Sequence, residues 1–471
     1  MPATRIRVAP AADDLASILA GLPERLGIDP EFPSDALAEA DRSAAHPHLP
    51  DADATDLELV TIDPPGSLDL DQALHLERDG GGFLVHYAIA DVPAFVPLGG
   101  ALDRETRRRG QTLYAPDRRI PLHPDSVGQG AASLLPEAVR GAFVWRMRLD
   151  ASGAVVDTAL ARARVRSRLR LDYAGVQADL DAGRATGSLG LLREVGEARQ
   201  AQELRRGGAS LDGVEVEVEP DGAGYRLVRR SPLPVEGWNA QLSLLTGMEA
   251  ARIMLGGGVG ILRTMPAPEE AAVDRFRRQT VALGAPWPAG QSYGEYLRAL
   301  DPSAAHTPAI VHAAAALFRG AAYSAFDGTP PEHPEQSAIA APYAHVTAPI
   351  RRLVDRFGLL VCDALANGRE VDAAVRSALP ALPAAMASSG ALAGRLDRLA
   401  VDTVEAAVLS SRVGAIFDAV VLSAGDGRGT VQLLDPAVTA PCTGDLTAGD
   451  RVRVRLDSAD VSTAEVAFSR V

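Results

Sequence analysis

Three aspartates lie close together in the segment TIDPPGSLDLDQ, namely Asp63, Asp69 and Asp71. Asp63 ends an apolar run, and a Pro-Pro-Gly turn can then fold Asp69 and Asp71 back toward it. Side chains two residues apart in an extended segment project to the same side, so we expect Asp69 and Asp71 to share a face. Carboxylates gathered in this way repel one another unless a cation binds, and magnesium prefers hard oxygen ligands. The segment therefore indicates a magnesium site, although a solvated acidic turn would show the same local spacing.

The cysteines and histidines do not suggest another kind of metal site. Cys362 and Cys442 lie far apart and form no C-x-x-C pair, and the nine histidines form no H-E-x-x-H or H-x-x-x-H pair. A zinc site of thiolates or imidazoles is therefore not expected. Any catalytic metal would be held by oxygen.

Arginine supplies every positive charge of the chain apart from histidine, because the sequence contains no lysine. The net charge is −14, so the whole surface does not favour nucleic acid, and binding would depend on local clusters. Such clusters occur at residues 107–109, 118–119, 162–170 and 351–356. Each one taken alone is as well explained by a solvated surface.

Arg351 and Arg352 belong to the most informative cluster. The sequence predicts a helix over residues 347–364, with Thr347 as N-cap and Pro349 in the first turn. Two cations in a first turn oppose the helix dipole, so this placement makes most sense if an anion binds between them. Tyr114 lies between arginines 107–109 and 118–119, and an aromatic among arginines is typical of single-strand binding sites. An isolated tyrosine or arginine pair, however, more often belongs to the core or to a solvated surface.

Hydrophobic periodicity predicts three regions. Residues 12–26 and a segment after Ser34 have helical patterns and precede a linker that ends near residue 50. Residues 57–91 read as strands with a hairpin at DGGG, whereas stretches 190–205, 236–255, 268–284, 307–326 and 348–412 read as helices. Five short strands follow residue 414, as in an OB-type barrel. We predict an α+β catalytic domain over residues 51–412, a helical segment over 1–50 and an all-β OB-fold over 413–471.

No apolar run approaches the roughly 20 residues of a membrane span, and the first residues lack the apolar stretch of a signal peptide. We therefore expect a cytoplasmic protein without a membrane partner.

Several further motifs occur in order along the chain, and together with the aspartates they resemble the ribonuclease II/R family. They are HYAIADV (86–92), LDRETRRRG (102–110), LYAPDRRIPLHP (113–124), SLLP (133–136) and TAPIRRLVD (347–355). The resemblance covers roughly residues 35–410 and continues into the C-terminal strands. It implies a 3′→5′ exoribonuclease that uses one or two magnesium ions, or manganese in their place, and releases 5′-mononucleotides.

The same resemblance assigns roles to individual residues. Asp63, Asp69 and Asp71 would hold the metal, Asp71 and Arg351 would be catalytic, and Tyr114, Arg351 and Arg352 would contact RNA. Asp91 also matches a family position, but it could simply brace the sheet. The family signature has a fourth aspartate where this chain has Gln72. An amide oxygen can still coordinate a cation, so Gln72 remains a candidate ligand, but it carries no charge and cannot act as a base.

Gln72 leaves alternatives open. The chain could be a family member that binds RNA without turning it over, or a hydrolase of another phosphodiester, against which the OB-type strands and Tyr114 argue. We expect a monomer that takes single-stranded 3′ ends. Family members of the ribonuclease II type carry N-terminal OB-folds that narrow the entrance, whereas only about 50 residues precede the acidic motif here. These residues could form a helix-turn-helix-like unit or a packing arm. Because no such narrow entrance is expected here, duplexes with 3′ overhangs are also expected substrates.

Overall fold

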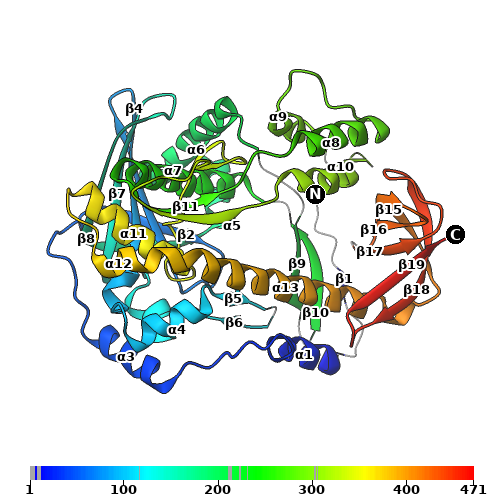
Figure 1. Cartoon of the computed structure of the whole chain (residues 1–471), viewed down its shortest axis with the longest axis horizontal. Helices are drawn as coiled ribbons and strands as arrows, with labels where there is room; N and C mark the ends of the chain where they lie inside the picture. Colours follow the sequence, from blue (N-terminus) through cyan, green and yellow to red (C-terminus); the bar gives the residue numbers. More distant parts are fainter. Residues whose placement is uncertain are drawn as a thin grey trace.

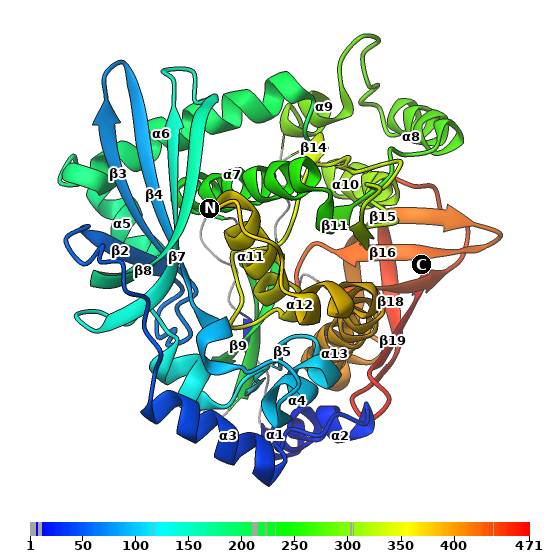
Figure 2. The ribbon, with the colours of Figure 1, turned by 60° about the vertical axis from the view of Figure 1, so that its left-hand side comes forward.

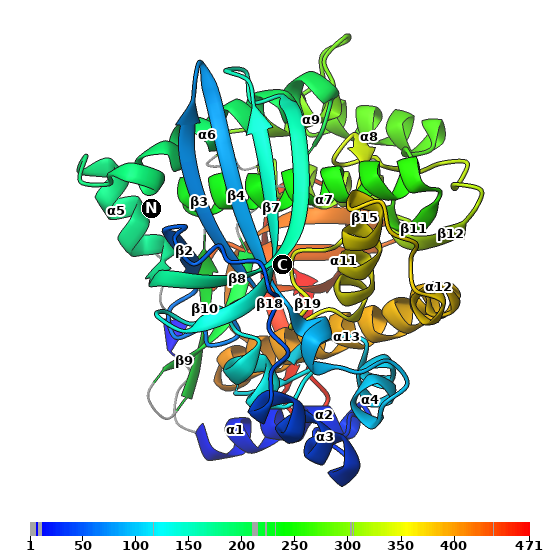
Figure 3. The ribbon, with the colours of Figure 1, turned by 90° about the vertical axis from the view of Figure 1, so that its left-hand side faces the viewer.

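The computed structural model describes residues 6–7, 12–115, 117–209, 215–221, 224–230, 232–301, 304, 306–436 and 438–471. A closed barrel of five strands carries the acidic segment, with the strand order β2-β3-β4-β7-β8. Strand β2 runs parallel to β8, and the other neighbours are antiparallel. Figure 3 shows β3, β4 and β7 side by side. The bounds are β2 Leu59–Asp63, β3 Gln72–Asp79, β4 Gly82–Ala90, β7 Val139–Leu149 and β8 Val155–Asp172.

Apolar side chains explain these strands, most of all β4, where every residue except Leu84 is buried. Tyr87, Phe143 and Trp145 are buried, and they pack in one cluster with Trp238 and Leu242 of helix α7 (Pro234–Gly257). Residues Asp79 and Gly82 pair across the expected hairpin between β3 and β4. A core of this size holds the strand ends that bear Asp63 and Gln72 in place.

Helices surround the barrel and connect it to smaller sheets. Helix α6 lies against α7 and β3, and α11 lies against α7 and β8. The larger helices are α4 Ala101–Arg109, α5 Tyr173–Asp181, α6 Gly187–Arg206, α8 Glu270–Ala282 and α11 Leu353–Ala366, with the shorter α9 Tyr293–Arg298, α10 Thr307–Ala314 and α12 Ala373–Ala378. The small strands are β1 Ile6–Arg7, β5 Leu113–Tyr114, β6 Arg119–Ile120, β9 Glu215–Asp221, β10 Gly224–Arg230, β11 Val259–Thr264, β12 Ala322–Asp327, β13 Glu335–Gln336 and β14 Ala341–Pro342.

A second closed barrel follows at the C-terminal end and confirms the expected five-stranded OB-type fold. Its order is β15-β16-β17-β19-β18. Alternate side chains point inward, as in β18, where Val452, Val454 and Leu456 are buried. The strands are β15 Ile416–Gly425, β16 Arg428–Leu433, β17 Thr439–Thr443, β18 Arg451–Asp460 and β19 Glu465–Arg470.

Helix α13 (Leu382–Leu409) joins the two barrels (Figure 1). It runs from the region of α11 and α12 to the C-terminal barrel, where it contacts β18 and β19. Glu405 of α13 is buried at this contact and accepts a hydrogen bond of 3.1 Å from the backbone N–H of Thr439. Burial, together with the charge of Asp402, raises the pKa of Glu405 to about 8.

The N-terminal helices are α1 (Ala12–Ala20), α2 (Leu22–Arg25) and α3 (Ser34–Ala45). The expected helix over residues 12–26 is divided at Gly21, and α3 begins at Ser34 as anticipated. Leu15 and Leu19 are buried in a cluster that also contains Leu396 of α13 and residues of the C-terminal barrel. The three helices are visible along one edge of the molecule in Figure 2. Their role as a helix-turn-helix-like unit stays a prediction.

Two expected helices were partly wrong. The stretch 307–326 is helical only at first, because Ala322–Asp327 forms β12, which pairs with β11. The helix expected from Thr347 begins only at Leu353. In both places, pairing with distant residues prevails over the local helical pattern. None of the described helices is long and apolar enough to cross a bilayer.

Candidate active site

Asp63 lies at the end of β2, and Asp69 lies in the loop that leads to β3. Asp63 is the last residue of β2, and Gly66 turns the chain with a φ of 86°. Burial, and then the negative charge of Asp69, raise the pKa of Asp63 to about 6. Asp69 forms an ion pair of 3.3 Å with Arg119. The two carboxylates are therefore close enough for the charge of one to affect the pKa of the other, and that they hold a cation stays a prediction.

Ser133 fixes the segment between these aspartates. Its hydroxyl donates to the carbonyl of Leu68 at 2.6 Å and accepts from the N–H of Leu70 at 3.0 Å. The N–H of Leu134 donates to the carbonyl of Leu70 at 3.0 Å. The SLLP motif thus acts as a support for the acidic segment.

Asp71 is 5% exposed and faces a loop from the distant part of the chain. Its Oδ1 accepts a hydrogen bond of 2.7 Å from the N–H of Ile350, and its Oδ2 lies 3.6 Å from Nε of Arg351. Burial raises the pKa of Asp71 well above its usual value, while the charge of Arg351 opposes that shift. Asp71 therefore binds the backbone of this loop at Ile350 and forms an ion pair with its Arg351 side chain.

Residues 347–352 form what we call the arginine loop, and here the sequence prediction needs correction. Arg351 and Arg352 precede helix α11 and do not lie in its first turn. The loop does not continue the helix, because the backbone of Arg352 is extended, with φ −133° and ψ 126°, and the Ile350 carbonyl accepts a hydrogen bond of 2.9 Å from His123. The N–H groups of Ala348 and Ile350 donate to Asp355 and Asp71.

Arg351 and Arg352 differ in their surroundings. Arg352 forms two hydrogen bonds, of 2.9 and 2.8 Å, with the buried carboxylate of Asp355. The Arg351 side chain is 45% exposed. Arg352 therefore has a structural partner, whereas Arg351 remains accessible to an anion.

Tyr114 lines the same hollow as both arginines. It is 55% exposed at the end of β5, and the hollow has a volume of about 350 Å³. Helix α13 forms the opposite wall, since Ala393, Gly394 and Asp397 line it as well. An aromatic ring and an accessible guanidinium in one hollow match the requirements of a nucleotide, whose base can stack and whose phosphate carries charge.

Gln72 begins β3 and turns its amide toward helix α7 and the arginine loop. Its Nε2 donates to the carbonyl of Thr347 at 2.7 Å. Its Oε1 accepts from the hydroxyl of Tyr87 and lies 3.3 Å from Oγ of Ser243. Asp91, the other residue of uncertain role, is fully buried and binds Arg162 of β8 through both carboxylate oxygens, which supports a bracing role.

Tyr173 is a residue near the centre that sequence reasoning missed. Asp63 pairs with Asp172 across the parallel strands β2 and β8, so the next residue begins helix α5 close to the carboxylates. Burial, and then the charge of Asp63, raise the pKa of Tyr173. No local pattern marks this tyrosine, because only the pairing of the two strands places it there.

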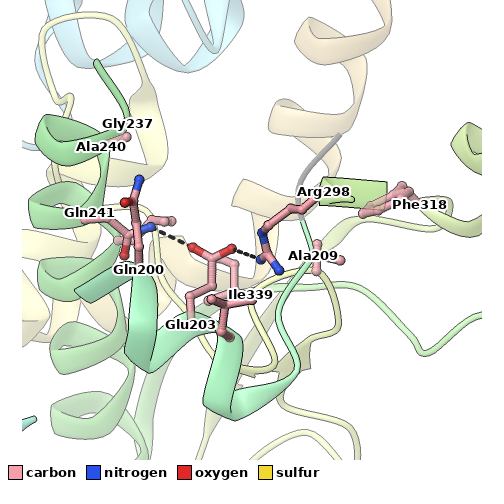
Figure 4. A pocket seen from close by; sticks show the side chains of 12 residues that line it. Gln200, Glu203, Ala209, Gly237, Ala240, Gln241, Arg298, Phe318 and Ile339 are labelled. Atoms are coloured by element: carbon pink, nitrogen blue, oxygen red, sulfur yellow. Dashed lines mark hydrogen bonds and ion pairs between the residues drawn. The ribbon is translucent and has the colours of Figure 1, made fainter. Parts of the chain in front are cut away.

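A larger hollow of about 560 Å³ lies between α6, α7 and Arg298 at the end of α9 (Figure 4). Glu203 stands at its centre and accepts hydrogen bonds from Gln241 at 2.6 Å and Arg298 at 2.9 Å. The acidic segment does not contribute to its lining. Glu203 is the one acidic residue in its lining, so this hollow brings no pair of carboxylates together.

The carboxylate centre suits a metal with few protein ligands. Within the part of the chain that the structure describes, no three His, Cys, Asp or Glu side chains are grouped so as to hold a metal ion. Magnesium, however, keeps several waters and binds proteins through one or two carboxylates together with substrate phosphates. Asp63 and Asp69, whose charges affect each other, would provide such a pair of carboxylates.

Two protein-family models match this chain. The RNB domain matches residues 52–359, and the RNase II-type exonuclease C-terminal S1 domain matches residues 415–471. The chain belongs to the RNB family of RNase II/R exoribonucleases. The resemblance stated from the ordered motifs is thereby confirmed. Nucleases of the RNB family typically depend on a metal.

Curated relatives of this RNB protein include two exoribonucleases. Ribonuclease R of Escherichia coli is 29% identical over 325 residues, which are 64% of this chain and 39% of the relative. Exosome complex exonuclease RRP44 homolog A of Arabidopsis thaliana is 27% identical over 324 residues, 65% of this chain and 34% of the relative. The match thus takes in well under half of the length of these relatives.

Solved structures share the fold at lower identity. The apo form of Mycoplasma genitalium RNase R superposes with a TM-score of 0.86 at 19% identity, over 98% of this chain and 78% of that one. Yeast Ssd1, described as a pseudonuclease, superposes with a TM-score of 0.71 at 15% identity, over 94% and 57%. This fold therefore occurs both in RNase R and in a protein described as a pseudonuclease.

Proposed function

We propose that this RNB protein is a metal-dependent exoribonuclease that removes 5′-mononucleotides from the 3′ end of RNA. The observation that carries the proposal is the meeting of Asp71 with Arg351, which brings the acidic segment and the arginine loop into one centre. Carboxylates for a cation, a guanidinium for phosphate and an aromatic ring for a base are the parts that phosphodiester hydrolysis of a single strand needs.

Each side chain has a separate task in this mechanism. Asp63 and Asp69 would hold magnesium, or manganese in its place, and the ion when bound supplies Lewis-acid chemistry and an activated water. Arg351 approaches the scissile phosphate and stabilises the charge that develops on its oxygens. Asp71 fixes the position of Arg351. Tyr114 stacks on a base and so aligns the last nucleotide with the centre.

The direct test uses single-stranded RNA labelled at its 5′ end. With magnesium or manganese we expect progressive shortening from the 3′ end, release of mononucleotides and complete inhibition by EDTA. A control variant, Asp157→Asn, changes an exposed aspartate of β8 outside the carboxylate centre and should leave the rate unchanged. Full-length RNA that persists with either metal would contradict the proposal.

A second function, RNA binding without turnover, has two observations in its favour. The chain has an uncharged residue at position 72, and a pseudonuclease is among its structural neighbours. Under this alternative the protein would retain labelled RNA in a filter-binding assay while the RNA stayed intact. The hydrolysis assay distinguishes the two.

Structured RNA is part of the proposal as well. A structure of Mycoplasma genitalium RNase R in complex with double-stranded RNA superposes on this chain with a TM-score of 0.82 at 20% identity, over 98% of this chain and 84% of that one. We expect the protein to digest a duplex with a 3′ overhang into the paired region. Sizing the products on a sequencing gel tests this, and a stall several nucleotides before the duplex would contradict it.

A further inference from the structure

The arginine loop is bound to the acidic segment at two points. Asp71 accepts from the N–H of Ile350, and the neighbouring Gln72 donates from its amide to the carbonyl of Thr347, both at 2.7 Å. These bonds join residues that are 279 and 275 positions apart in the sequence. Consecutive side chains of one segment thus hold the loop that presents Arg351 at its first residue, Thr347, and at Ile350, which directly precedes Arg351.

The amide of Gln72 is suited to this contact by its chemistry. A carbonyl oxygen such as that of Thr347 needs a donor, and an ionised aspartate offers only acceptors. The opposite end of the amide is equally occupied, since Oε1 accepts from the buried hydroxyl of Tyr87 and lies 3.3 Å from Oγ of Ser243. A metal ion at this oxygen would have to displace these hydroxyl groups.

We propose that Gln72 is a positioning residue for Arg351 and not a metal ligand. Its amide links the start of β3 to Thr347 and keeps the arginine loop at a fixed distance from the carboxylates. The metal would then be held by carboxylates alone. This inference rests on the proposed exoribonuclease function and specifies how this chain uses the position where its family has an aspartate.

The deciding variant is Gln72→Met, which keeps the length of the side chain but removes its hydrogen bonds and adds no charge. Tyr87 and Ser243 can still bond each other, because their oxygens are 3.3 Å apart. We expect the kcat for RNA hydrolysis to fall by about 10- to 100-fold, the usual cost of a misplaced catalytic group. KM should change little. The affinity for Mn²⁺, titrated without RNA, should stay within about threefold of wild type, because the substitution removes no metal ligand if Gln72 does not bind the ion.

Gln202→Met is the matched control. Gln202 also donates from its amide to a backbone carbonyl, that of Ser152 at 3.0 Å, but it lies on the surface of α6. This variant should match wild type in rate and Mn²⁺ affinity. If Gln72→Met instead weakens Mn²⁺ binding by tenfold or more and excess magnesium restores its rate, Gln72 is a ligand. If both its rate and its Mn²⁺ affinity equal those of wild type, Gln72 does not position the loop either.

Hydrogen exchange separates this inference from the proposed function. The amides of Ala348, Ile350, Arg351 and Arg352 should exchange faster in Gln72→Met than in wild type or Gln202→Met, because the loop has lost one of its attachments. This measurement needs no turnover. Unchanged exchange would overturn the positioning role, whereas absence of hydrolysis by the wild type would overturn only the exoribonuclease proposal.

Discussion

The carboxylate of Asp71 and the guanidinium of Arg351 lie side by side, with 3.6 Å between Oδ2 and Nε. The aspartate is buried and the arginine is partly exposed, so the pair joins the protein interior to the hollow where RNA would bind. A buried carboxylate that also accepts a backbone hydrogen bond has little freedom to move. It therefore determines where Arg351 begins its approach to a phosphate.

Asp71→Asn should lower the rate of hydrolysis by at least ~100-fold, because an amide removes the charge opposite Arg351. RNA affinity should remain within about threefold of wild type, since it is distributed over many phosphate contacts. Single-turnover kinetics and filter binding measure the two effects separately. Equal loss of rate and affinity would mean that Asp71 mainly supports RNA binding or folding.

Arg351→Lys should reduce kcat by roughly 100- to 1,000-fold, because lysine keeps the charge but loses the planar pair of donors that fits a phosphate. The control is Arg78→Lys, since Arg78 forms an exposed ion pair with Glu194. Steady-state kinetics on a short single-stranded RNA give the comparison. A rate for Arg351→Lys near that of the control would argue against a phosphate contact.

Tyr114→Ala should weaken binding of single-stranded RNA by ~1–3 kcal/mol, which is the contribution of one stacked base. Tyr114→Phe retains the ring and should bind nearly as well as wild type. Fluorescence anisotropy with labelled RNA, in EDTA to prevent cleavage, measures both. If the two variants lose the same affinity, the hydroxyl and not the ring makes the contact.

Glu405→Gln should alter the dependence of stability on pH. The pKa of Glu405 is raised from an ordinary value of 4.5 to about 8 in the folded chain, mainly by burial. Between these values the folded chain retains a proton that the unfolded chain has released, so the free energy of unfolding falls as pH rises from 4.5 to 8 and levels off above 8. Glutamine remains neutral and can still accept from Thr439.

The variant should therefore match wild type near pH 4.5 and become more stable toward pH 8, by at most ~1.4 kcal/mol for each pH unit. Urea unfolding at pH 4.5, 6 and 8 tests this, with Glu197→Gln on the exposed face of α6 as control. A constant difference between variant and wild type at all three pH values would contradict the assignment.

Local patterns predicted much of this fold. Apolar runs on either side of the DGGG turn located the hairpin of β3 and β4. Short alternating runs located the five strands of the C-terminal barrel, where a strand such as β18 buries one face. They did not predict where helix α11 begins. Thr347 and Pro349 look like a helix start, but Asp71 and Asp355 engage the backbone of Ile350 and Ala348 instead. The bond from Ile350 depends on Asp71, which is 279 positions away and lies in no local window.

The candidate site, like the fold, could be predicted from the sequence only in part. The spacing of Asp63 and Asp69 predicted that the two carboxylates would lie near each other, but it did not predict that Asp71 would bind the arginine loop. Tyr173 was not recognised, because its position depends on the parallel pairing of β2 with β8. The partners of Gln72 were equally hidden, since Tyr87, Ser243 and Thr347 come from three separate elements.

The long separation of the two halves of the centre also matters during synthesis. The acidic segment leaves the ribosome first, and the residues that bind it follow 275 and 279 positions later. Until then Asp71 has no arginine beside it and Gln72 has no carbonyl to bind. The strands of the first barrel, which end at Asp172, are therefore all synthesised before this centre can form.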